Sequence, residues 1–125
     1  MLPKENRLKH DRDFITLFAE GRFVLGSLVN AQIWKIDPAK YPRRKYSLED
    51  LKIGFVVSKK LSKSAVKRNR VKRQMREAVR LILQKNNLKT GYLLLILAKN
   101  EILEQDFTEI QKSMEQILRR VSLLN

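Results

Sequence analysis

The sequence contains no cysteine and only one histidine, His10, among its 125 residues. Without cysteine the chain forms no disulfide and offers no thiolate to a metal ion. Its longest strongly apolar run, residues 92–98, is far shorter than the roughly 20 residues that a membrane-spanning helix needs. The first residues are basic but no apolar run follows them, so they do not resemble a signal peptide. We therefore expect a soluble cytoplasmic protein with no membrane partner.

Acidic residues are also scarce. The chain has 13 Asp and Glu against 27 Lys and Arg, a formal net charge of +14. The excess is concentrated in residues 52–89, which hold 13 basic residues and one acidic residue, Glu77. So many like charges destabilise a compact domain by repulsion unless a polyanion neutralises them. A positive charge focused on one segment is typical of a nucleic-acid-binding domain.

The sequence has no recognisable catalytic or metal-binding constellation. His10 lies in a polar N-terminal segment, and no group of His, Asp and Glu has the spacing of metal ligands. Asp11, Asp13 and Glu20 could touch a hydrated magnesium ion at a nucleic-acid interface, although helix capping explains the first two more simply. We expect no catalytic side chain in this protein, and no metal or other cofactor bound by the protein alone.

Hydrophobic residues make up 43% of the chain, enough for one packed core, so residues 1–125 are expected to form a single domain. Residues 1–10 are predicted to be a basic N-terminal arm. Residues 37–51 are predicted to be a connecting loop or a hairpin extension.

Apolar periodicity predicts an α+β fold with the element order α-β-β-β-α-β-α, in which three helices pack on a small mixed sheet. The predicted elements follow one another along the chain. The first is a helix capped by Asp11 or Asp13 and ending near Glu20, followed by strand residues 23–36, which turn near Gly26, and by a strand over residues 52–58. A long helix, capped by Ser62 or Ser64, then ends near residue 87. A strand over residues 92–98 follows, and the last element is a helix that begins at Gln105 or Asp106 and places Phe107 on its buried stripe.

The long predicted helix has two chemically different faces. At 100° per residue, one face collects aliphatic side chains: Val71, Met75, Ala78, Val79 and Ile82. The opposite face collects basic ones: Arg70, Lys72, Arg73, Arg76 and Arg80. Solvated faces normally mix charges of both signs, and each like-charged neighbour costs a few tenths of a kcal/mol. The helix therefore predicts a polyanionic partner, while a membrane surface would compete with the core for its apolar face.

Three segments, in this order, resemble the bacterial ribonuclease P protein family. The N-terminal Arg7-Leu8-Lys9 with Asp13-Phe14 is similar to the opening of the family. Residues 54–60, GFVVSKK, are similar to the strand before its signature, and residues 67–73, KRNRVKR, to the arginine-asparagine-arginine signature itself. The resemblance implies a fold like the second domain of ribosomal protein S5, with a left-handed crossover through the basic helix.

The resemblance also implies a function and partners. The protein would be a monomer that binds a catalytic RNA, and the two would remove the 5′ leader from precursor tRNA, with the active site and its Mg²⁺ in the RNA. The residues it implies for the catalytic RNA are Lys59, Lys60, Lys67, Arg68, Asn69, Arg70, Lys72, Arg73 and Arg76. Those it implies for the leader cleft are Phe14, Phe18, Gln32 and Trp34. Phe14 and Phe18, four residues apart, fit a core position equally well, and Trp34 fits the core or a contact with a covering loop.

Two other functions remain open. A ribosomal protein or ribosome-assembly factor would share the charge, the size and the fold class. A DNA-binding regulator would place a short recognition helix after a tight turn and would form a symmetric dimer. The basic helix predicted here follows a strand and is long. The signature together with its upstream strand favours a ribonuclease P subunit over both alternatives.

Overall fold

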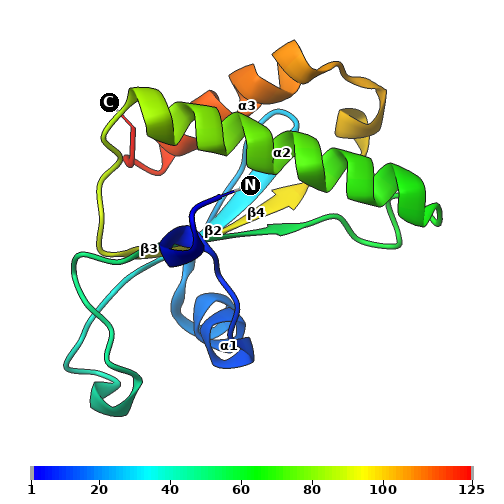
Figure 1. Cartoon of the computed structure of the whole chain (residues 1–125). Coiled ribbons are helices and arrows are strands. Elements are labelled where there is room, and N and C mark those ends of the chain that lie inside the picture. The colour runs from blue at the N-terminus through cyan, green and yellow to red at the C-terminus, as the bar shows by residue number, and fades with distance from the viewer. Residues whose placement is uncertain (1, 125) are drawn as a thin grey trace.

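The computed structural model describes residues 2–124, which fold into three α-helices and one four-stranded sheet (Figure 1). The helices are α1 (Asp11–Glu20), α2 (Ala65–Lys85) and α3 (Phe107–Arg120). The strands are β1 (Arg22–Val24), β2 (Val29–Lys35), β3 (Leu51–Val56) and β4 (Tyr92–Ala98). Short 3-10 turns occupy Lys4–Asn6, Pro42–Arg44 and Asn100–Glu104. The predicted α+β class and element order are confirmed.

The strands lie in the order β1-β2-β4-β3. β2 is antiparallel to both of its neighbours, and β3 is parallel to β4. Helix α2 is therefore the crossover between two adjacent parallel strands. Its handedness stays a prediction of the family resemblance.

The sheet separates two apolar layers. α2 and α3 cover one face and α1 lies on the other (Figure 1). Because side chains alternate along a strand, Ala31 and Ile33 of β2 join the core beneath α2 and α3, while Trp34 joins the smaller core beside α1. The buried strand β4 contributes to both layers, with Leu94 in the first and Leu95 in the second.

Side-chain caps fix the starts of α2 and α3. The Ser64 hydroxyl accepts from the Lys67 backbone N–H at 3.3 Å, and the Asp106 carboxylate accepts from the Glu109 N–H at 3.0 Å. These contacts confirm Ser64 and Asp106 among the predicted alternatives.

The predicted cap of α1 is wrong. Its N-cap is His10, which makes no side-chain capping hydrogen bond, and Asp11 is already the first helical residue. Asp13 is buried at 5% exposure and accepts a hydrogen bond from the Tyr46 hydroxyl instead. The Asp13 carboxylate, which the local sequence predicted as a possible helix cap, therefore binds a residue that is distant in the sequence.

The N-terminal segment packs along the edge of β3. Leu2 and Leu8 are buried, and Arg7 forms a parallel bridge with Ile53. The Asn6 side-chain amide donates to the Leu51 carbonyl at 2.8 Å. The predicted basic arm thus extends the open edge of the sheet.

The connection between β2 and β3 docks on α1. The Tyr41 hydroxyl donates to the Glu20 carboxylate at 2.6 Å, and the Tyr46 hydroxyl donates to Asp13. Burial raises the pKa of Tyr46 above 10.0, and the hydrogen bond to Asp13 adds to the rise. Residues 37–50 are thereby attached to α1 by tyrosine hydrogen bonds.

Candidate nucleic-acid interface

The residues predicted to bind the catalytic RNA lie on one continuous stretch of chain that begins after β3 and ends in the fourth turn of α2. Lys59 and Lys60 are exposed in the connection, and none of the predicted side chains is buried. Within residues 2–124 no ion pair involves any of them. We call this set the basic surface: Lys59, Lys60, Lys67, Arg68, Asn69, Arg70, Lys72, Arg73 and Arg76.

Two arginines of the basic surface are anchored by backbone carbonyl groups. Arg68 donates to the Ser62 carbonyl at 2.8 Å, and Arg70 donates to the Leu103 carbonyl at 3.2 Å. A guanidinium carries five N–H donors, so each arginine keeps donors for a ligand after this contact. The anchors reduce the side-chain freedom that a phosphate contact would otherwise remove.

Helix α2 has a single acidic residue, and it does not neutralise the basic surface. The Glu77 carboxylate accepts two hydrogen bonds from Arg80, one of them at 3.0 Å. The hydrogen bonds from Arg80 lower the pKa of Glu77, so this group stays charged at neutral pH. Arg80 and Glu77 thus balance each other, and the basic surface keeps its full charge.

A first pocket of about 510 Å³ lies beside β3 and α1. Its walls combine basic and apolar side chains: Leu2, Arg7, Leu8, Lys9, Phe14, Ile53, Gly54, Phe55 and Arg76. A Cβ at Gly54 would lie 3.0 Å from a methyl group of Leu8, so the absence of a side chain lets the N-terminal segment lie close to β3. We call this cavity the α1 pocket.

The structure separates the two predicted aromatic residues of α1. Phe14 is half-buried, packs on the smaller core and also lines the α1 pocket. Phe18 is 60% exposed and does not line the α1 pocket. Phe14 therefore lies both against the core and in the wall of the pocket, the two positions that the sequence left open. Phe18 is not a core residue.

The other two residues predicted for the leader cleft lie beneath α1 and the loop. The Gln32 amide donates to the Leu17 carbonyl at 2.9 Å, and the side chain is 7% exposed. Trp34 is also 7% exposed, because the rings of Tyr41 and Tyr46 pack edge-on against it, with ring centroids 6.2 and 5.4 Å from its own. Both residues lie on the face of the sheet that α1 covers, and their contact with RNA stays a prediction.

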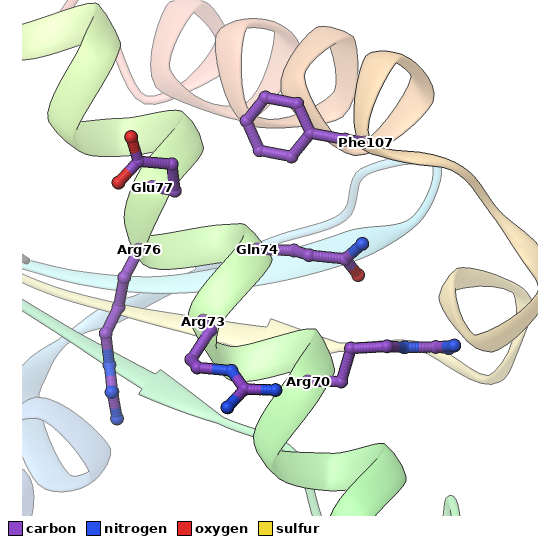
Figure 2. A pocket seen from close by; sticks show the side chains of 6 residues that line it. All are labelled: Arg70, Arg73, Gln74, Arg76, Glu77 and Phe107. Carbon is purple, nitrogen blue, oxygen red and sulfur yellow. The ribbon is translucent and has the colours of Figure 1, made fainter.

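A second pocket, of about 470 Å³, lies between α2 and the start of α3 (Figure 2). It is lined by Arg70, Arg73, Gln74, Arg76, Glu77 and Phe107. We call it the α2–α3 pocket. Sequence reasoning gave Gln74 no role and placed Phe107 on the buried stripe of α3. One sequence feature could have indicated this pocket: Gln74 and Arg70 are spaced i,i+4, which places an amide beside a guanidinium on one helix face.

Arg76 lines both pockets, so the basic surface connects them. Within residues 2–124 no group of three or more His, Asp and Glu side chains is placed to hold a metal ion. In the same range no helix combines the length and the apolar character required to cross a bilayer.

A small α+β domain that presents unpaired basic side chains beside pockets containing aromatic rings has the features of an RNA-binding domain. The family model described as Ribonuclease P matches residues 2–122. The chain therefore belongs to the ribonuclease P protein family, as the segments around residues 7, 54 and 67 predicted.

Relatives and solved structures agree with this assignment. The ribonuclease P protein component of Pseudanabaena sp. is 33% identical over 125 residues, covering 100% of this chain and 98% of that protein. The component of Symbiobacterium thermophilum is 33% identical over 123 residues, covering 98% and 96%. The RNase P protein structure from Staphylococcus aureus has a TM-score of 0.72 at 24% identity and covers 98% of this chain and 100% of that one. The one from Thermotoga maritima has a TM-score of 0.71 at 22% identity and covers 91% and 96%. These structures share the fold.

Proposed function

We propose that this chain is the protein subunit of a ribonuclease P holoenzyme. It binds a catalytic RNA and the 5′ leader of precursor tRNA, and it assists the endonucleolytic removal of the leader that gives the mature 5′ end. The observation that carries the proposal is the basic surface, most of which lies on α2. None of its side chains forms an ion pair with an acidic side chain of residues 2–124.

The basic surface supplies the contacts with the catalytic RNA. Guanidinium groups bind phosphate oxygens through two parallel hydrogen bonds, and lysines add mobile point charges. Each phosphate that the protein neutralises releases counterions, which favours binding at low salt. Neutralising these phosphates also lowers the charge repulsion between the catalytic RNA and an approaching precursor tRNA. The protein is thus expected to matter most when magnesium is scarce.

The α1 pocket is the proposed site for the leader. Single-stranded RNA is held by aromatic rings within a positively charged groove. Phe14 provides a ring, and Arg7, Lys9 and Arg76 provide the charge. The exposed ring of Phe18 extends this surface along α1. Gln32 and Trp34 would contribute by holding α1 and the docked loop in place.

The proposed division of labour follows from the family resemblance. Hydrolysis of the phosphodiester bond is assigned to the RNA and its Mg²⁺. Because the family resemblance places this chemistry in the RNA, the proposal gives the protein no catalytic residue and no metal of its own. Its contribution is to bind, to position the leader and to neutralise phosphate charge.

The test is cleavage of a precursor tRNA with a 5′ leader by a bacterial ribonuclease P RNA at low magnesium. The reactions contain no protein, the wild type, or Lys67→Ala/Arg73→Ala. Both of these side chains are exposed, and neither is anchored to a carbonyl as Arg68 and Arg70 are. We expect the wild type to restore leader removal and the double variant to restore less of it.

The matched control is Lys112→Ala/Arg119→Ala on α3, which removes the same charge from exposed side chains with acidic neighbours. It should behave like the wild type. If the wild type binds the RNA but leaves cleavage unchanged, the basic surface reports general RNA affinity, and the protein is a ribosomal or ribosome-assembly factor.

A further inference from the structure

The α2–α3 pocket has two chemically different ends. Arg70 and Arg73 place two guanidinium groups at the end nearer the start of α2 (Figure 2). Glu77 lies one turn further along, with its carboxylate held by Arg80. An anionic group is therefore favoured at the Arg70 end, whereas the other end carries an ion pair whose charges balance.

Between these ends lie an amide and an aromatic ring. The Gln74 and Phe107 side chains extend from α2 and α3 into the space between the two helices (Figure 2). Phe107 is half-buried at the first position of α3. An aromatic face beside an amide is suited to a planar group that carries hydrogen-bond donors and acceptors at its edge.

Gln74 has an unsatisfied hydrogen-bonding group. Its Oε1 atom is buried, and among the buried side-chain oxygen and nitrogen atoms of residues 2–124 it is the one without a hydrogen-bond partner. Buried acceptors without a partner are rare because they lose their hydrogen bonds to water and gain nothing in return. A ligand that donates a hydrogen bond to Oε1 would remove this cost.

We propose that the α2–α3 pocket binds one unstacked nucleotide of the RNA partner. The base lies against Phe107 and donates to Gln74, and the phosphate lies on Arg70 and Arg73. The pocket volume of about 470 Å³ falls within the range of ordinary small-ligand sites, about 300–1,000 Å³. The inference rests on the proposed function and adds a defined subsite to the basic surface.

A nucleotide fits this pocket better than a bare anion does. An inorganic phosphate or sulfate would use the two arginines and leave Phe107 and Gln74 without a role. A nucleotide carries both an aromatic base and a phosphate, so one ligand can use all four groups. Stacking on a protein ring is open to any base, since each has an aromatic face.

The first test measures nucleotide binding by the free protein. Adenosine monophosphate and ribose 5-phosphate are titrated separately into the full chain while NMR signals of the Gln74 amide and the Phe107 ring are followed. We expect saturable shifts at both groups with adenosine monophosphate and not with ribose 5-phosphate. Equal shifts with the two compounds would show an anion site alone and would overturn the proposal, as would the absence of shifts with adenosine monophosphate.

The second test measures the affinity for ribonuclease P RNA of Gln74→Met and Phe107→Leu. Gln74→Met replaces the amide with an apolar side chain of similar length, and Phe107→Leu keeps an apolar side chain without the ring. A melting curve verifies folding. Gln74→Met should melt at the wild-type temperature or above, because it removes an unpaired acceptor, yet it should bind RNA about fivefold more weakly. Phe107→Leu should weaken binding about 5- to 100-fold because its side chain cannot stack on a base.

The matched control is Gln84→Met, an exposed glutamine near the end of the same helix, which should leave RNA affinity unchanged. If Gln74→Met and Phe107→Leu both bind RNA as the wild type does, the nucleotide site is wrong. The proposed function then still stands, provided that the wild type promotes cleavage. If the wild type does not promote cleavage but RNA binding depends on Gln74, the proposed function fails and the nucleotide site stands.

Discussion

Helices α2 and α3 have the same structural task but different outer surfaces. They cover the same face of the sheet, each begins at a side-chain cap, and each buries five side chains. The outer side of α3 pairs its charges, Glu109 with Lys112 at 3.5 Å and Glu115 with Arg119 at 3.8 Å. The first three turns of α2 contain no acidic residue. Packing on the sheet evidently does not require this excess of positive charge, so the excess identifies the surface that meets a partner.

Charge reversal on the two helices should give the largest difference. Lys67→Glu/Arg73→Glu on α2 should lower the affinity for ribonuclease P RNA about a thousandfold, because two charge-assisted hydrogen bonds are removed and two repulsions are added. Lys112→Glu/Arg119→Glu on α3 makes the same change in net charge and should cost less than about tenfold. Filter-binding titrations at one fixed salt concentration measure both. Equal reductions would mean that net charge alone controls binding.

Removing core side chains should affect the two helices alike. Met75 of α2 and Ile117 of α3 are each fully buried. Met75→Ala and Ile117→Ala should each lower the free energy of unfolding by about 2–5 kcal/mol. Urea denaturation gives both values. If Met75→Ala costs almost nothing, α2 is not firmly packed in the free protein, and its comparison with α3 fails.

Removing the caps should give smaller effects of a similar size. Ser64→Ala and Asp106→Ala should each cost about 1 kcal/mol of unfolding free energy, with the larger cost at Asp106, whose negative charge also favours the start of a helix. Asp106→Asn keeps an acceptor and should retain most of the stability. A larger destabilisation in Asp106→Asn than in Asp106→Ala would show that capping is not the role of this carboxylate.

Anions should stabilise the free protein through α2. At equal ionic strength, replacing chloride with sulfate should raise the melting temperature by a few degrees, because an ion that binds only the folded state stabilises it. Lys67→Ala/Arg73→Ala should show a smaller rise than Lys112→Ala/Arg119→Ala. The same melting temperature in sulfate and chloride would contradict the prediction that clustered arginines destabilise the free protein.

Local sequence patterns were sufficient to predict most of the elements. The period of the apolar residues located all three helices, and the break near Gly26 separated β1 from β2. The aliphatic stripe predicted for the long helix is the stripe that α2 buries. These features depend on neighbours a few residues apart, which a single sequence displays directly.

The features that the sequence did not predict depend on contacts between distant segments. The partner of Asp13 is Tyr46, 33 residues away, and no local pattern connects the two. The burial of Trp34 likewise depends on where residues 41–46 dock. The α2–α3 pocket forms because Phe107 of α3 lies near Gln74 of α2, and β4 separates these two helices in the sequence. The sequence therefore singled out Arg70, Arg73 and Arg76 of this pocket, whereas it gave no indication that Gln74 and Phe107 would line it.

The central claim is that the basic surface of α2 binds RNA phosphates, and the salt dependence of binding tests it most directly. The logarithm of the affinity for ribonuclease P RNA is plotted against the logarithm of salt concentration for the wild type and the two double alanine variants. Lys67→Ala/Arg73→Ala should flatten the slope by about two units, roughly one for each phosphate that the variant no longer neutralises. Lys112→Ala/Arg119→Ala should keep the wild-type slope. Equal slopes for all three proteins, or the same flattening in both variants, would contradict the claim.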